Sequence, residues 1–227
     1  MKKRLNFEDD VAEKLHGKLI PTKEAIKLLK AMVISDEPAP GNPVCGDRNC
    51  IVLFESLCPT SEKTSSSMAE VCICAGEPYA SRAINDNLGK SRRINEEEAI
   101  RILETKNAKG HVHYIYFKEC ESGKFYAICN CCQDCCATVG SEHGKGPKLI
   151  PAGYIAVVDP NKCIGCGQCM EYCPFGAMNL RDKRMRINPR KCMGCGVCTN
   201  KCRKEALRLA RNKKHPAPLL VDKLKNK

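Results

Sequence analysis

The chain has 227 residues, a formal net charge of +12 and 19 cysteines, but no tryptophan and only 5% aromatic residues. This length suits one ordinary domain or two small ones. With so few large apolar side chains, the hydrophobic core alone would stabilise the fold weakly. This favours metal centres or disulfides as further stabilising elements. The N-terminal MKKRLNFEDDVAEK lacks the apolar segment of a secretory signal, and the apolar run at 51–54 is far too short for a membrane span. We therefore expect a cytoplasmic protein, in which many reduced cysteines indicate metal binding rather than disulfides.

Two amphipathic helices are predicted in the first region. The segments KEAIKLLK (23–30) and EEAIRILE (97–104) both carry apolar residues at helical spacing. Thr22 and Asn95 precede them as predicted caps, and Asn95 is followed at the capping-box spacing by a glutamate. The second helix is expected to end before Gly110, because glycine favours the position that follows a helix.

A β-hairpin with a dense cysteine cluster at its exit is predicted next. HVHYIYF (111–117) and FYAIC (125–129) are typical strands, separated by a turn. His111 and His113 share one strand face and could reach a metal, although a structural role is favoured. The cluster ICNCCQDCC supplies five candidate metal ligands, which are Cys129, Cys131, Cys132, Cys135 and Cys136.

Three interpretations of this cluster remain open on the sequence alone. A further iron–sulfur cluster, with additional upstream thiols, is favoured over a zinc site. Free thiols, or neighbouring pairs that are redox-active, form the third interpretation. This region also resembles uncharacterised ferredoxin-domain proteins of anaerobes, which carry a CNCC-type cluster after an E-E-A-x-x-I/L helix.

The cysteine pattern changes after a stretch that is typical of a linker. SEHGKGPKLIPAG (141–153) is rich in Gly, Pro and Lys. We therefore expect a cysteine-rich N-terminal α+β domain over 1–148, a second domain over 149–212 and a basic tail over 213–227. Such a tail is either solvated or a docking arm for an acidic partner or nucleic acid.

The second domain contains two copies of one motif, CIGCGQCMEYCP and CMGCGVCTNKC, both with the spacing C-x2-C-x2-C-x3-C. Three thiolates at this spacing can wrap three corners of a cubane cluster, and the interleaved glycines let the backbone turn closely around it. From about Tyr154 to Ala210 the chain resembles bacterial-type ferredoxins that hold two [4Fe–4S] clusters. The resemblance implies a pseudo-twofold α+β fold with short hairpins and two small helices.

In such proteins the fourth ligand of each cluster comes from the other motif. The resemblance therefore implies one set made of Cys163, Cys166, Cys169 and Cys202, and a second set made of Cys192, Cys195, Cys198 and Cys173. Two zinc ions explain the pattern poorly, because zinc sites use pairs of C-x2-C hooks.

The motif departs from the family at one position, and the charge of the chain is also unusual. Cys173 is followed by Pro174 as in the family, but Cys202 is followed by Arg203, which places a cation beside a cluster. A low reduction potential, on the order of −400 mV or below, is expected by analogy with other all-cysteine ferredoxins. Many free ferredoxins are acidic, so a net charge of +12 favours a dedicated partner with an acidic docking surface.

The favoured function is transfer of single low-potential electrons to or from a partner oxidoreductase in the cytoplasm of an anaerobe. No residue would act as an acid or base, so the chain is more an electron carrier or oxidoreductase subunit than an enzyme. Two alternatives remain open: a reductase with a substrate-binding N-terminal cluster fed by the ferredoxin module, and a redox sensor. Nucleic-acid binding is disfavoured, because no aromatic residues interleave with the basic tail.

Overall fold

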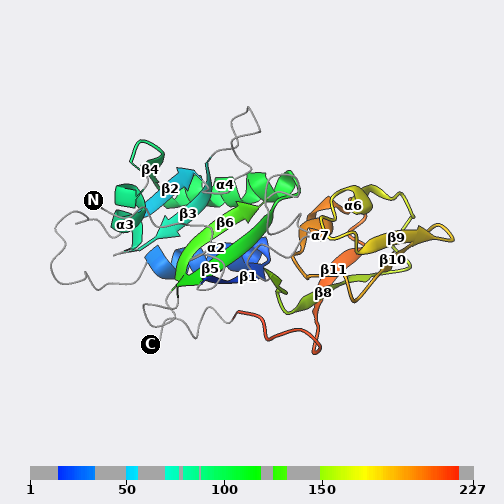
Figure 1. Cartoon of the computed structure of the whole chain (residues 1–227). Coiled ribbons are helices and arrows are strands. Elements are labelled where there is room, and N and C mark those ends of the chain that lie inside the picture. Colours follow the sequence, from blue (N-terminus) through cyan, green and yellow to red (C-terminus); the bar gives the residue numbers. More distant parts are fainter. Residues whose placement is uncertain are drawn as a thin grey trace.

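The computed structural model describes residues 15–33, 50–55, 70–76, 79–86, 88–118, 125–131 and 149–219. These residues form a large sheet with helices, followed by a smaller part made of short strands and two short helices (Figure 1). The mixture of helices and strands confirms the α+β class.

The N-terminal part is built on one seven-stranded sheet of order β4-β2-β3-β6-β5-β1-β7. Its strands are β1 (Leu15–Ile20), β2 (Ile51–Glu55), β3 (Glu70–Ala75), β4 (Ser91–Ile94), β5 (Val112–Lys118), β6 (Phe125–Cys131) and β7 (Leu149–Ile150). The predicted hairpin is confirmed, because β5 and β6 pair antiparallel with Val112 opposite Cys131. The β7 strand pairs parallel with β1, so two residues of the predicted linker belong to this sheet.

One face of this sheet is covered by two of the three helices that the described N-terminal residues form. The helices are α2 (Thr22–Val33), α3 (Tyr79–Asp86) and α4 (Glu96–Ala108). Leu29 of α2 and Leu103 of α4 are fully buried against the isoleucines of the central strands, and the two helices pack against each other. The opposite face carries a second core that contains all five of the described N-terminal cysteines.

The predicted helix ends are correct for α4 and wrong at one position for α2. Asn95 caps α4, since its side chain accepts a 2.8 Å hydrogen bond from the Glu98 backbone N–H. Gly110 follows that helix at φ +91°, as its lack of a Cβ permits. Thr22 is the first residue of α2 rather than its cap, because the preceding Pro21 carbonyl accepts the first backbone hydrogen bonds. The Thr22 hydroxyl is turned instead toward His113.

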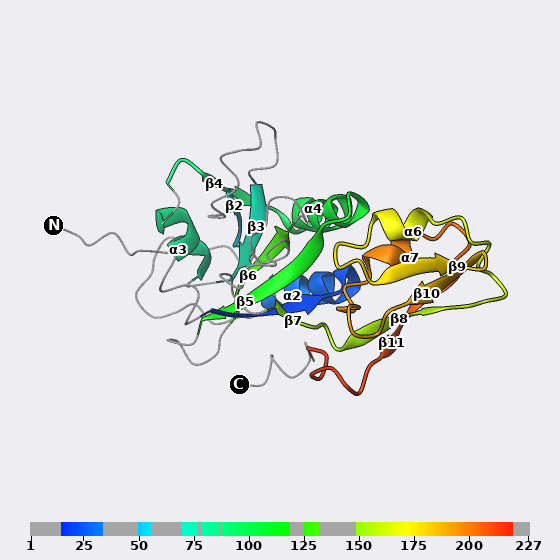
Figure 2. The ribbon, with the colours of Figure 1, turned by 45° about the vertical axis from the view of Figure 1, so that its right-hand side comes forward.

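The C-terminal part has an internal pseudo-symmetry. The strands β8 (Tyr154–Val158) and β11 (Leu207–Arg211) pair antiparallel, as do β9 (Met178–Arg181) and β10 (Arg184–Ile187). Two short helices, α6 (Gln168–Glu171) and α7 (Val197–Lys201), lie above these strand pairs (Figure 2). This arrangement is the ferredoxin-like architecture that the repeated motif predicts.

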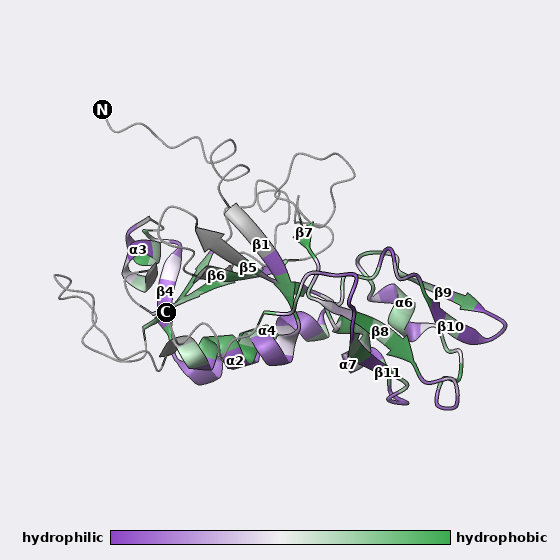
Figure 3. Ribbon diagram, turned by 90° about the horizontal axis from the view of Figure 1, so that it is seen from below, coloured by the Kyte–Doolittle hydropathy of each residue, from purple (hydrophilic) through white to green (hydrophobic). Residues whose placement is uncertain are grey.

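The two parts are in direct contact. Tyr154 at the start of β8 donates a hydrogen bond to the Glu24 carboxylate of α2, and burial together with this carboxylate raises the pKa of Tyr154 to about 12. Lys201 at the end of α7 donates to the Ala108 carbonyl at the end of α4. Val197 of α7 is fully buried within the core on the cysteine-bearing face of the sheet. Figure 3 shows the second part beside the ends of α2, α4 and β1.

Some of the first residues of the predicted basic tail contact the folded parts of the chain. Lys18 of β1 donates a hydrogen bond to the Ala217 carbonyl, and His215 Nδ1 lies 3.2 Å from the Tyr154 carbonyl oxygen. Leu219 packs against the helix-covered core. Lys213 and Lys214 are nevertheless exposed, so the solvated interpretation of the tail stays a prediction, and residues 220–227 lie outside the described part of the chain.

Candidate metal centres

Each of the two cysteine motifs is a loop that leads into a short helix through a left-handed glycine. Gly167 precedes α6 at φ +79° and Gly196 precedes α7 at φ +82°. Six of the eight motif thiols belong to the core of the C-terminal part, which also contains Ala177 and Met185. These six are Cys163, Cys169, Cys173, Cys192, Cys198 and Cys202. The two motifs, which share one cysteine spacing, thus also share one loop-and-helix conformation.

The four thiols of the first set lie near one another. Burial, together with the neighbouring thiols of Cys202, Cys166 and Cys163, raises the pKa of Cys169 to about 11. Cys202 is contributed by the second motif, so it reaches across the module to the first. Cys166 is the exposed member of this set.

The second set lines one pocket of the structure. Its four thiols are Cys173, Cys192, Cys195 and Cys198, and the pocket is completed by apolar side chains such as Phe175 and Ile187. Burial raises the pKa of Cys195 to about 12, with further contributions from Cys173 and Cys192. Burial also raises the pKa of Cys198, to which the thiols of both sets contribute. The two sets are therefore close neighbours.

The chemistry of both sites fits an iron–sulfur cluster. Buried thiols with raised pKa values become thiolates only beside a strong positive charge, which the iron ions would supply. Backbone N–H groups already point at the sulfurs: Ala156 donates to Cys192 Sγ at 3.4 Å, Ala177 to Cys173 Sγ at 3.4 Å and Ala206 to Cys202 Sγ at 3.2 Å. Such hydrogen bonds stabilise a thiolate and tune the potential of a cluster.

The glycines of the motifs are required by close backbone approaches. A Cβ added at Gly165 would fall within 3 Å of the Lys183 carbonyl group, and one added at Gly194 would meet the Tyr154 carbonyl group in the same way. The first cysteine loop thus lies against the turn between β9 and β10, and the second lies against β8. This contact fixes the loop around the volume that a cluster would occupy.

Among the described residues, no three Cys, His, Asp or Glu side chains converge as the ligands of one metal ion would. A tetrahedral zinc ion with bonds of about 2.3 Å holds its sulfurs about 4 Å apart. A cubane holds its four thiolates at separate corners of a larger object, so its ligands are more widely spaced.

The candidate ligands of the N-terminal cluster are only partly within the described structure. Cys129 and Cys131 lie at the end of β6, while Cys132, Cys135 and Cys136 fall outside the described residues. Cys129 is directly opposite Cys72 on the adjacent strand β3, and the two sulfurs form a disulfide. A disulfide sulfur has no thiolate charge to give to a metal. The role of Cys129 as a metal ligand therefore stays a prediction. Cys129 can bind a metal only after its disulfide with Cys72 has been reduced.

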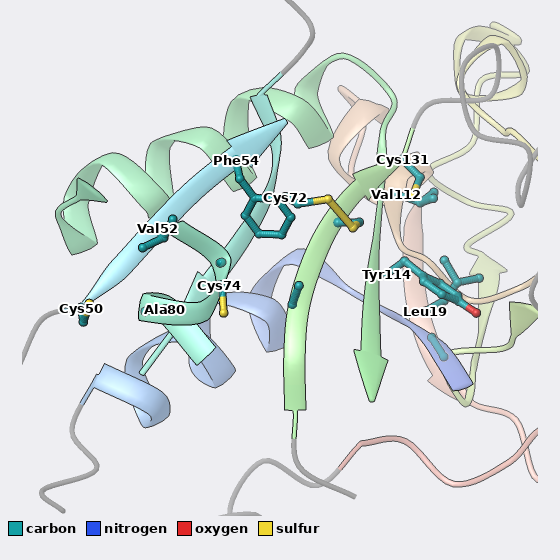
Figure 4. Packing of buried hydrophobic residues seen from close by; sticks show 14 of the residues in the cluster. Leu19, Cys50, Val52, Phe54, Cys72, Cys74, Ala80, Val112, Tyr114 and Cys131 are labelled. Atoms are coloured by element: carbon teal, nitrogen blue, oxygen red, sulfur yellow. A yellow bond between two sulfur atoms is a disulfide. The ribbon is translucent and has the colours of Figure 1, made fainter. Parts of the chain in front are cut away.

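The structure also groups cysteines that the sequence analysis did not assign. Cys50, Cys72 and Cys74 share one buried core with Cys129 and Cys131 (Figure 4). Arg93 of β4 donates to Cys50 Sγ at 2.6 Å. The spacing C-x-C occurs in both β3 and β6, and because strand side chains alternate, it puts both cysteines of a strand on one face. That signal was available in the sequence.

His113 of β5 and His111, the residue before that strand, both make hydrogen bonds within the protein. His113 Nδ1 lies 2.7 Å from the Asn130 side-chain oxygen, and its Nε2 lies 3.0 Å from the Thr22 hydroxyl. Burial lowers the pKa of His113 to about 4, so the ring is neutral, with Nδ1 donating and Nε2 accepting. His111 Nδ1 lies 3.3 Å from the Asn130 carbonyl oxygen. His113 is therefore engaged at both ring nitrogens, on the helix-covered side of the sheet.

The fold and the two thiol sets define the C-terminal part as a ferredoxin-like domain suited to two clusters. Residues 155–203 match the family model of the 4Fe-4S dicluster domain. This match confirms the resemblance for the C-terminal part only, and the N-terminal resemblance stays a prediction. Among the described residues, no helix is both long and apolar enough to cross a membrane.

The chain is also similar to two proteins of Escherichia coli over a short segment. Each is the B subunit of an ion-translocating oxidoreductase complex, one from strain O127:H6 (E2348/69 / EPEC) and one from strain O1:K1 / APEC, and they are 49% and 46% identical over 35 residues. The segment covers 15% of this chain and 18% of each relative. The chain thus spans less than a fifth of the relatives' length.

Proposed function

We propose that this protein is an electron carrier that passes single low-potential electrons between two [4Fe–4S] clusters and a partner oxidoreductase. The observation that supports the proposal is the position of two thiols, since Cys202 lies near the first triplet and Cys173 lies near the second. When bound, the clusters supply reversible one-electron chemistry. The chain holds them, excludes water and aims N–H groups at their sulfurs.

The two cluster sites have different surroundings, so electrons can enter the module at one site and leave it at the other. The first site opens outward through the exposed Cys166, beside the exposed side chains of Ile164 and Met170. The second site faces inward, because Cys195 and Met193 pack against the N-terminal core. We therefore place exchange with an external partner at the first site and exchange with the N-terminal part at the second.

The outward site is surrounded by positive charge. Lys162 precedes the first cysteine, and the turn between β9 and β10 lies against the same loop through the contact of Lys183 with Gly165. Lys162, Lys183 and Arg184 are exposed. An acidic patch on an oxidoreductase complex would complement this surface and would cover its apolar centre during electron transfer.

We further propose a metal centre in the N-terminal part, built on the candidate ligands Cys129, Cys131, Cys132, Cys135 and Cys136. The support is position: the end of β6 lies in the core against which the second cluster site packs. If the disulfide with Cys72 persists, four thiols of the five remain, which is the number that one cluster or one zinc ion needs.

The experiment is an anaerobic determination of iron, sulfide and zinc in the full chain, combined with a redox titration followed by EPR. Two clusters predict about eight irons and two one-electron reductions at low potential. About twelve irons would add a third cluster, whereas one zinc with eight irons would assign zinc to the N-terminal part. Colourless protein without iron would refute the proposed carrier function.

A further inference from the structure

The Cys72–Cys129 disulfide lies inside the protein, where the cysteine-rich composition led us to expect reduced thiols. Its two cysteines are directly opposite each other on β3 and β6. Cys72 is 3% exposed and Cys129 is 9% exposed. Neither the proposed clusters nor the helix-covered core requires this bond.

The disulfide lies in the same apolar core that receives the second cluster site. On β5, Val112 is opposite Cys131 and Tyr114 is opposite Cys129. Both side chains belong to the core that includes Val197, with Cys195 packed against it. Figure 4 shows Val112 beside Cys131 on this face. A short series of packed side chains therefore joins a cluster ligand to the disulfide.

We propose that Cys72 and Cys129 form a dithiol–disulfide couple that is reduced by the ferredoxin module of the same chain. This inference rests on the proposed electron-carrier function. In the step, the S–S bond takes up two electrons, one from each of the two reduced clusters, and two protons from solvent. The S–S bond breaks, two S–H bonds form and both clusters return to their oxidised level.

Burial decides which reductant can reach this bond. Reduction by an external thiol requires a thiolate to attack one of the sulfurs in line, and the burial of both cysteine residues prevents that approach. Electrons need no such access. Low-potential clusters are also strong enough reductants for a disulfide of the structural kind. The Cys72–Cys129 couple would thus combine two one-electron transfers from the clusters into one two-electron reduction.

The test uses the full, cluster-loaded chain without oxygen and a reduced viologen as one-electron donor. Samples taken before and after cluster reduction are quenched in acid, unfolded and alkylated with a light reagent. They are then treated with a phosphine and alkylated with a heavy reagent. Mass spectrometry of the peptides that contain Cys72 and Cys129 reports the fraction disulfide-bonded. We expect the heavy label before reduction and at least a tenfold fall of heavy label after it.

The matched control is the single variant Cys72→Ser, which cannot form the disulfide but keeps Cys129 and all eight motif cysteines. It should take up two fewer electrons per chain than the wild type in a coulometric titration, with unchanged cluster EPR signals. A second control treats oxidised wild type with dithiothreitol under native conditions, which should leave the heavy label in place.

Three outcomes would overturn the inference. Heavy label that persists while EPR shows reduced clusters would mean an inert structural disulfide, and light label before any reductant would mean that no disulfide forms. In both cases the carrier function would stand, because iron content and EPR report it independently. Protein without clusters would refute both proposals.

Discussion

The side-chain amide of Asn200 donates a 2.7 Å hydrogen bond to the amide oxygen of Asn107. Asn107 is 2% exposed at the end of α4, whereas Asn200 is exposed on α7. This bond therefore satisfies a buried group of the N-terminal part with an exposed group of the ferredoxin module. With the neighbouring contact of Lys201 to the Ala108 carbonyl, it holds the second cluster site against the sheet.

Loss of this hydrogen bond should weaken the joint between the two parts. We expect Asn200→Ala to lower the free energy of unfolding by about 1–3 kcal/mol, because the buried Asn107 oxygen loses its partner. The measurement is denaturant unfolding of the cluster-loaded chain. Asn179→Ala, at another exposed asparagine of the same module, is the matched control and should stay within about 0.5 kcal/mol of wild type. Equal effects of the two substitutions would contradict this account of the joint.

The two halves of the module differ at the turn that follows the fourth cysteine of each motif. Gly176 has φ +54°, and its counterpart Glu205 has φ +49°. Because a residue with a Cβ is strained in this region, we expect Glu205→Gly to stabilise the protein by about 0.5–1 kcal/mol. Gly176→Ala should destabilise it by about 1 kcal/mol through backbone strain alone, since nothing lies within 4 Å of the added Cβ. Thermal unfolding under anaerobic conditions measures both, and destabilisation by Glu205→Gly would be evidence against strain at this turn.

The close approach at Gly194 should be essential for cluster binding. Gly194→Ala places a Cβ within 3 Å of the Tyr154 carbonyl group, so the loop must move away from β8 and the second set of thiols opens. We expect about half of the iron to be lost, because one of two clusters fails to bind. Gly167→Ala is the control: its φ is +79° and nothing lies within 4 Å of its added Cβ, so it carries similar strain without the clash. Equal iron loss in the two variants would show that backbone strain, not the contact with β8, limits binding.

The neutral His113 should make the N-terminal part sensitive to acid. Its pKa is about 4 in the folded chain because of burial, against an ordinary value of 6.5, so protons bind more tightly to the unfolded chain. The stability that this residue contributes is therefore complete above pH 6.5 and declines as the pH falls toward 4. A difference of this size corresponds to about 3 kcal/mol. His113→Gln should reduce the pH slope of unfolding between pH 7 and pH 4.5, measured at each pH as the difference from wild type. An unchanged slope would mean that the ring does not control the acid response.

The positive surface around the first cluster site should steer charged reactants. K183E/R184E changes the charge by −4, so we expect oxidation of the reduced protein by ferricyanide, an anion, to slow several-fold at low salt. Oxidation by a cationic cobalt hexammine complex should accelerate, and both effects should fade at high salt. K213E/K214E makes the same charge change on exposed residues after β11, and it should have a smaller effect. Identical effects of the two variants would argue against local steering at this site.

The cysteine motifs could be recognised from sequence because their information is local. The spacing of three cysteines and two glycines specifies a loop around a cluster whatever surrounds it. The Asn95 cap and the hairpin of 111–117 with 125–129 were predictable for the same reason, since capping and strand alternation depend on neighbours in the chain. The first residue of α2 was misassigned because Pro21 occupies the preceding position and Thr22 turns to His113, a residue 91 positions away.

The sequence by itself determined the chemistry of the ferredoxin module, because side-chain type and short-range spacing decide which atoms can hold a cluster. Only the tertiary structure decided which way that module faces, with Cys166 exposed and Cys195 packed against the sheet. It also decided that Cys72 meets Cys129, two residues that are 57 positions apart in the chain. Strand order and register bring such partners together, and they depend on how the whole chain buries its apolar surface rather than on any local pattern.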